Sequence, residues 1–443
     1  MPSASLLKAA AVNALKMSQV GRGLCLPGMN RYMPVMHGAQ GCTSFGLVLL
    51  VRDFREAIPL QTTAMNEVSS TLGGMENIAK AVLNIRLRAK RDLIAICSTG
   101  LTETKGDDVN AYLRLTAEAP RPGRYLTGLC PHALTTGASQ DGWAKALEAL
   151  AGRWESRGRA DARQADNLLA GCHLTPADIE EMRDIVQSFG LEPIVLPDVS
   201  SWLDGHLPDN FSPTSMGGTT LAEMRALGAS IVCIANRRTE APPTAQAVQE
   251  LCGVPYVVFD RLTGLQANDR FLAYLEYVSG QPIPARYRRQ RSQLQDAMLG
   301  WPLLLRPGVK VAIGAEPEPV AVTLRHGWPR WAAELGGCRD HHDLAGARWR
   351  SPQPGWWIGA NLEAPGTKGA RARACAGSCW LTHSHGGQAA ERLHIPFHRA
   401  GLPPCSTGLG AGHCLSVGYR GTRGLIFEIG QPVAGRGPCT YPG

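Results

Sequence analysis

Short runs of apolar and β-branched residues alternate with amphipathic stretches along most of the chain, and this alternation limits the possible folds most strongly. Leu93–Ser98 is a buried-strand pattern that ends in the polar turn Thr99–Thr102, and a helical pattern follows over 107–115. The unit recurs with a strand pattern at 167–172 and a helix that begins after Thr175. Strands that alternate with helices pair in parallel. The sequence therefore predicts the α/β class.

The start of the second helix carries the clearest local signal. Thr175 is a residue type that accepts hydrogen bonds from the first turn of a helix, and Pro176 suits the first helical position. The same reading along the chain predicts further elements. The expected strands are 193–197, 230–235, 254–259, 309–313, 381–384 and 395–397, and the expected helices are 221–227, 244–252, 268–278, 287–298 and 388–393.

Composition excludes several classes of protein. Apolar residues make up 44% and charged residues 19%, which excludes a disordered or fibrous chain. The longest uninterrupted apolar run, Phe45–Val51, is far shorter than the roughly 20 residues of a membrane helix. The net charge of +8 comes from 37 Arg and 8 Lys without a basic stripe, so we expect neither nucleic acid nor membrane as a partner. Thirteen cysteines without a signal-peptide pattern predict reduced thiols or metal ligation rather than a disulfide framework, and a cytoplasmic protein.

One segment does not fit the α/β pattern. From Thr323 to Trp380 there are 58 residues without Val, Phe or Tyr and with one Ile, whereas six of the ten Trp lie there. Parallel strands are built from Val, Ile and Leu, and a structureless insertion of this length is uncommon in a compact domain. We interpret the segment as a shifted reading frame, with a genuine insertion as the alternative. A C-x3-C-x3-H-x-H spacing at 375–385 lies mostly inside it, so we do not assign a zinc site.

The densest motif runs from Met33 to Gly46. Gly38 and Gly41 bracket a turn and deliver Cys42 at the start of an apolar segment, a geometry that suits a thiolate presented from a loop to a metal cluster. A lone cysteine is more often a small core residue, because iron–sulfur sites usually need several closely spaced cysteines. The chain has no G-x-G-x-x-G after a strand, no Walker A loop and no G-x-S-x-G elbow.

Three runs of sequence together resemble a known family. They are His37–Gly46 (HGAQGCTSFG), Arg55–Glu67 and Ser98–Asp108, and similarity returns in the charged helix pattern at 286–298. The chain resembles the nitrogenase component 1 superfamily and, within it, the scaffold subunits on which the iron–molybdenum (FeMo) cofactor is assembled. The resemblance implies three doubly wound, Rossmann-like parallel-sheet domains. We expect them at 1–160, 161–282 and 283–443, the last being irregular because it contains 323–380.

The resemblance also implies a cluster ligand. In the nitrogenase β subunit three cysteines help to hold the P-cluster, and the first corresponds to Cys42. The other two positions fall on Leu60 and Gly100, which cannot ligate iron. In the scaffold subfamily one such cysteine completes a 4Fe-4S cluster whose other ligands come from the partner subunit. Cys42 is therefore the expected iron ligand, and Cys97 is expected to be a buried strand thiol.

The implied role is structural, with no catalytic residue of its own. The expected partner is a NifE-type subunit in an E2N2 heterotetramer. That complex holds the FeMo cofactor precursor mainly on the partner, receives it from a NifB-type donor and docks the nitrogenase iron protein. Alternatives are the β subunit of a catalytic nitrogenase or of a related protochlorophyllide reductase, and a nucleotide-binding oxidoreductase. The residues do not separate a molybdenum from a vanadium system.

Overall fold

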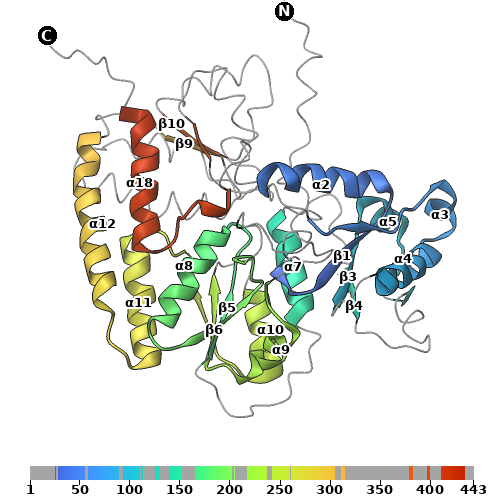
Figure 1. Ribbon diagram of the computed structural model, residues 1–443, viewed down its shortest axis with the longest axis horizontal. Coiled ribbons are helices and arrows are strands. Elements are labelled where there is room, and N and C mark those ends of the chain that lie inside the picture. The colour runs from blue at the N-terminus through green and yellow to red at the C-terminus, as the bar shows by residue number, and fades with distance from the viewer. Residues whose placement is uncertain are drawn as a thin grey trace, which may run out of the picture. The chain divides into compact units, whose positions relative to one another are not determined.

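The structure is a computed structural model of the chain. It describes residues 25, 28–54, 58–88, 93–109, 111–112, 125–129, 139–151, 165–201, 204, 217–236, 242–259, 261–304, 311–314, 379–382, 397–399 and 411–434. The described residues fall into two compact units (Figure 1). One lies within Ala14–Asp260 together with Thr407–Cys414, and the other within Arg261–Ser406 together with Leu415–Gly443.

The first sheet has four parallel strands in the order β2-β1-β3-β4. The strands are β1 (Tyr32–His37), β2 (Gln61–Thr62), β3 (Leu93–Ser98) and β4 (Tyr125–Leu129). β1 and β3 pair over their whole length, from Tyr32 beside Leu93 to His37 beside Ser98. Every residue of these two strands is buried, as the continuous apolar pattern of a central parallel strand requires.

Four described helices connect or cover this sheet (Figure 1). They are α2 (Gln40–Phe54), α3 (Glu67–Leu72), α4 (Met75–Arg88) and α5 (Gly100–Lys105). Helix α4 buries Ile78, Val82 and Ile85, which are spaced four and three residues apart and so share one face. This face packs in one cluster with alternate residues of β1 and β3, among them Val35 and Ile96. Burial of this apolar face holds α4 on the sheet.

The second sheet repeats the same strand order, β6-β5-β7-β8, and its pairings are all parallel. Its strands are β5 (Ala165–Leu169), β6 (Glu192–Leu196), β7 (Val232–Asn236) and β8 (Tyr256–Phe259), and its helices are α7 (Ser139–Ala151), α8 (Pro176–Gln187), α9 (Leu221–Ala226) and α10 (Pro242–Cys252). Thr175 caps α8 as expected, because its hydroxyl accepts from the backbone N–H of Asp178 at 3.1 Å.

The other unit contains a three-stranded parallel sheet, β11-β10-β9, and three long helices. The elements are α11 (Leu265–Ser279), α12 (Ala285–Leu304), β9 (Val311–Gly314), β10 (Cys379–Thr382), β11 (Phe397–Arg399) and α18 (Gly418–Ala434). Asp269 of α11 accepts two hydrogen bonds from Arg291 of α12, at 2.9 and 2.8 Å, and one from the hydroxyl of Tyr419 of α18 at 2.5 Å. One carboxylate thus ties the three helices together.

The α/β class and the parallel sheets are confirmed. One sheet lies within each of the ranges 1–160, 161–282 and 283–443, but the domain boundaries themselves stay a prediction. The turn expected at Thr99–Thr102 was wrong: α5 begins at Gly100 and ends at Lys105, and helical structure resumes at Val109. Threonine side chains that bond to backbone groups stabilise this short helix where propensity alone favours a turn.

One boundary in the C-terminal third differs from the expectation. Strand β10 begins at Cys379, two residues before the expected start at 381 and two residues inside the anomalous segment. The remainder of that segment, 323–378, and the helix expected at 388–393 lie outside the described residues. Among the described helices none is long and apolar enough to span a membrane.

Candidate functional site

The carboxyl ends of β1 and β3 form the point where the strand order of the first sheet reverses. From β1 the chain passes through α2 to β2 on one side, and from β3 it passes through α5 to β4 on the other. His37 and Ser98, the last residues of the two strands, lie side by side. In open parallel sheets ligands bind beyond the carboxyl ends of the strands at such a point. The Gly-rich turn and Cys42 directly follow this end of β1.

Cys42 is the third residue of α2 and is half-buried. The expected loop location was therefore wrong in detail. The turn is complete at Ala39, whose carbonyl accepts from the N–H of Cys42 at 3.1 Å, and the helix begins at Gln40. The first turn of a helix has unpaired N–H groups and favours negative charge, so it suits a thiolate.

The surroundings of Cys42 leave room for a ligand. Gly41 is exposed, and a Cβ placed on it would meet no atom within 4 Å. Leu60 and Gly100, where the resemblance places the other two cysteines of the catalytic subunits, have no side-chain donor atom for a metal. Among the described residues there is no group of three or more His, Cys, Asp or Glu that could hold a metal ion. The described part of the site therefore provides one half-buried thiol next to open space.

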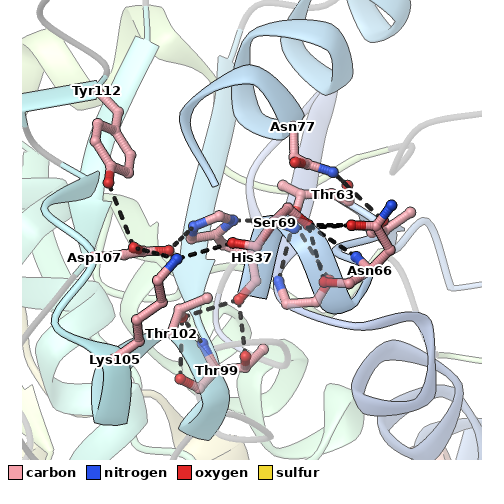
Figure 2. A network of polar contacts seen from close by, with 12 residues as sticks. His37, Thr63, Asn66, Ser69, Asn77, Thr99, Thr102, Lys105, Asp107 and Tyr112 are labelled. Carbon is pink, nitrogen blue, oxygen red and sulfur yellow. Dashed lines mark hydrogen bonds and ion pairs between the residues drawn. The ribbon is translucent and has the colours of Figure 1, made fainter. Parts of the chain in front are cut away.

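A buried polar network lies directly behind the turn (Figure 2). The ring of His37 is fully buried, with Nδ1 3.0 Å from Thr63 Oγ1 and Nε2 3.2 Å from Asp107 Oδ2. Burial lowers the pKa of His37 more than the neighbouring Asp107 carboxylate raises it, so the ring is neutral. A carboxylate can only accept, so the ring proton lies on Nε2 and Nδ1 accepts from the Thr63 hydroxyl.

The backbone of His37 is held from the side of β3. Its carbonyl accepts from the N–H of Thr99 at 3.2 Å, from the Thr99 hydroxyl at 2.8 Å and from the Thr102 hydroxyl at 3.1 Å. Gly38 has no space for a side chain, because a Cβ there would overlap the side chain of Thr99. These hydrogen bonds hold the start of α5 against the end of β1.

Asp107 has further partners (Figure 2). Its Oδ1 accepts from the hydroxyl of Tyr112 at 3.4 Å and lies 3.4 Å from Lys105 Nζ, which also donates to the carbonyl of Ser69 at 2.8 Å. Burial, more than the adjacent carboxylate, raises the pKa of Tyr112. The sequence motifs contained His37 and Asp107 but gave them no role, since 70 residues separate them and no local pattern pairs them.

Several of the other described cysteines are buried, whereas Cys414 is exposed. Cys97 is fully buried in β3, as expected, and Cys25, Cys172 and Cys233 are buried. Cys252 is half-buried at the end of α10. Cys130 lies outside the described residues.

Comparison with known proteins gives a consistent result. The family described as "Nitrogenase component 1 type Oxidoreductase" matches residues 19–434. The chain is 46% identical to the nitrogenase iron-molybdenum cofactor biosynthesis protein NifN of Bradyrhizobium diazoefficiens, over 96% of this chain and 90% of that protein. It is 36% identical to the protein of the same name from Nostoc, over 96% of this chain and 93% of that one.

Solved structures show the same likeness. A structure titled "Nitrogenase Cp1 at pH 6.5" matches with a TM-score of 0.80 and 25% identity, over 95% of this chain and 93% of that chain. A second, titled "Nitrogenase Cp1 at pH 5", is 12% identical with a TM-score of 0.62 and so bears on the fold alone.

Proposed function

Because the chain belongs to the nitrogenase component 1 type family, we propose that it is the NifN-type subunit of the scaffold on which the nitrogenase FeMo cofactor is assembled. Relatives from several bacteria that cover nearly the whole chain are named as cofactor biosynthesis proteins, at identities from 36% to 46% for three of them. These names support assembly rather than catalysis. We infer no catalytic residue in this chain.

The observation that carries the proposal is the single thiolate at the switch point. A 4Fe-4S cluster is held by four cysteine thiolates, and Cys42 with the open space beside Gly41 supplies one of them. As the family resemblance implies, the other three would come from a second chain, and Leu60 and Gly100 bear no ligand. The bound cluster would supply electron transfer. This chain would position one corner of it and exclude water from the turn behind it.

The exposed face of α2 supports a protein partner at this place. The stretch Gln40–Val48 contains no charged residue, and Gly41, Phe45 and Val48 share one face at spacings of four and three residues. The side chains of Phe45 and Val48 are 39% and 50% exposed. An uncharged apolar stripe one turn from the cluster ligand is suited to burial against another chain.

We propose a NifE-type subunit as that partner, in an E2N2 heterotetramer in the cytoplasm. The FeMo cofactor precursor would be held mainly on the partner after delivery by a NifB-type protein, and the complex would dock the nitrogenase iron protein. The alternative, a β subunit of a catalytic nitrogenase, is disfavoured because two of the three P-cluster cysteine positions are Leu60 and Gly100. An eight-iron cluster needs more thiolates than Cys42 alone supplies from this side.

The test replaces Cys42 by Ala in the complex purified with its natural partner. We expect loss or conversion of the electron paramagnetic resonance signal of the reduced cluster and a lower iron content. Cys252→Ala is the matched control, because that thiol is also half-buried but lies at the end of α10. An unchanged signal and iron content in Cys42→Ala would contradict the proposed ligand.

A further inference from the structure

We propose that Asp107, His37 and Thr63 form a hydrogen-bonded positioning relay that sets the turn before α2 and thereby the direction of the Cys42 thiol. The inference rests on the proposed function, because it concerns the geometry of the cluster ligand. It adds three positioning residues that do not themselves touch the cluster. The three come from the end of β1, the segment after β2 and the segment after α5 (Figure 2).

The hydrogen bonds of the relay have one direction, because the Asp107 carboxylate can only accept. Asp107 accepts from Nε2–H of His37 at 3.2 Å, so Nδ1 bears no proton and accepts from the Thr63 hydroxyl at 3.0 Å. The Thr63 hydroxyl therefore donates its proton to Nδ1 of His37. The other acceptor within reach, the carbonyl of Gly38, is farther away at 3.5 Å. The oxygen of Thr63 accepts from the N–H of Gly38 at 3.1 Å.

From Gly38 the constraint reaches Cys42 through the backbone. The carbonyl of Gly38 accepts from the N–H of Met65 at 2.9 Å, so this residue is held at both its N–H and its carbonyl by the segment after β2. The next carbonyl, that of Ala39, accepts from the N–H of Cys42 at 3.1 Å. The thiol is thus four residues from a backbone unit with a fixed orientation.

The relay has little freedom to rearrange. A Cβ on Gly74 would overlap the His37 ring at Cε1 and Nε2, and the Asp107 side chain is only 3% exposed. The segment that carries Thr63 is itself constrained, since Ala64 has a φ of +50°, a conformation uncommon for a residue with a side chain. Because water does not reach His37, a broken link leaves a buried group without a partner and the turn shifts to satisfy it.

The experiment uses the full complex with its natural partner and compares Thr63→Val, which removes the hydroxyl at equal shape, with Asp107→Asn, which weakens the tautomer constraint. We expect both to change the g-values or broaden the signal of the reduced cluster, to shift its midpoint potential, and to lower iron per complex at least two-fold in Thr63→Val. Thr63→Ser keeps the hydroxyl and should restore the native signal. Thr244→Val is the matched control, because that hydroxyl is fully buried but has no hydrogen-bond partner in the part of the chain that the structure describes.

The outcomes separate this inference from the proposed function. Native spectra, potential and iron content in Thr63→Val and Asp107→Asn would overturn the relay, provided that Cys42→Ala loses the signal. An unchanged Cys42→Ala would instead overturn the proposed ligand. If Thr63→Val yields no complex, Asp107→Asn decides: a shifted signal with a native Thr63→Ser supports the relay, and a native signal in Asp107→Asn refutes it.

Discussion

Asp166 is a buried acid whose ionisation should make the stability of the chain depend on pH. It lies in β5 and is fully buried, and neither of its carboxylate oxygens has a hydrogen-bond partner among the described residues. Burial raises its pKa from the ordinary value of 3.8 to about 6. Burial is the main reason why the pKa of the Cys233 thiol is raised, and the negative charge of Asp166 raises it further. Both effects express the same cost of placing charge inside the second sheet.

The sign of the effect follows from proton binding in the two states. Between pH 4 and 6 folded Asp166 keeps a proton that the unfolded chain has lost, so the free energy of unfolding falls as pH rises through this range. Well above pH 6 both states are ionised and the contribution is constant. A shift of about two units at roughly 1.4 kcal/mol per unit gives a total penalty of about 3 kcal/mol. Roughly half of it is present at pH 5 and nearly all of it at pH 8.

The replacement Asp166→Asn removes the titration while it keeps the shape. The variant should gain about 1–2 kcal/mol over the wild-type chain between pH 5 and pH 8, because only the wild type loses stability there. Urea unfolding followed by circular dichroism at several pH values measures this difference, and the titration of all other groups cancels in the comparison. A difference between variant and wild type that does not change with pH would refute the reasoning.

Two further predictions concern α2 and α5. Phe45→Glu should prevent co-purification with the partner subunit and leave thermal stability within about 0.5 kcal/mol, whereas Leu87→Glu, at a position 76% exposed on α4, should co-purify normally; a Phe45→Glu complex of native yield would exclude α2 from the interface. Gly106→Ala should destabilise the chain by about 1–2 kcal/mol in urea unfolding, because Gly106 has a φ of +81° at the end of α5 although a Cβ there would meet no atom; a neutral substitution would contradict the left-handed cap.

The sequence predicted those elements whose cause is local. The start of α8 could be predicted from Thr175 and Pro176, which are adjacent in sequence. The buried parallel strands β1 and β3 could be predicted from their continuous apolar runs, which also involve only adjacent residues. Helix α5 was missed because only part of its support is local, the bonds between Thr99 and Thr102. The rest is distant, since Thr102 also bonds to the carbonyl of His37, 65 residues away. Strand β10 was placed two residues late because the composition of its first residues, Cys379 and Trp380, differs from that of ordinary strands. The reading-frame interpretation of 323–380 stays a prediction.

The candidate site likewise has one part that the sequence could predict and one part that it could not. Cys42 could be found because glycines mark the turn and because a family motif surrounds it, whereas the relay of Asp107, His37 and Thr63 could not. A buried histidine with two partners becomes visible only when three segments 26 and 70 residues apart meet at the end of a strand. Each member alone has an ordinary explanation in sequence, as a turn residue or a polar residue near a strand end.

The proposed sharing of one cluster between two chains has a physical consequence for assembly. A cluster that needs ligands from two chains binds the complex and not the separate subunits, so cluster binding and subunit association stabilise each other by mass action. Such linkage favours a protein that must acquire its cluster only after it has found its partner. It also explains why the rigid element lies behind Cys42 and not around it: the buried network fixes the direction of the one donor, while Gly41 and the exposed face of α2 leave the remaining space for the other chain.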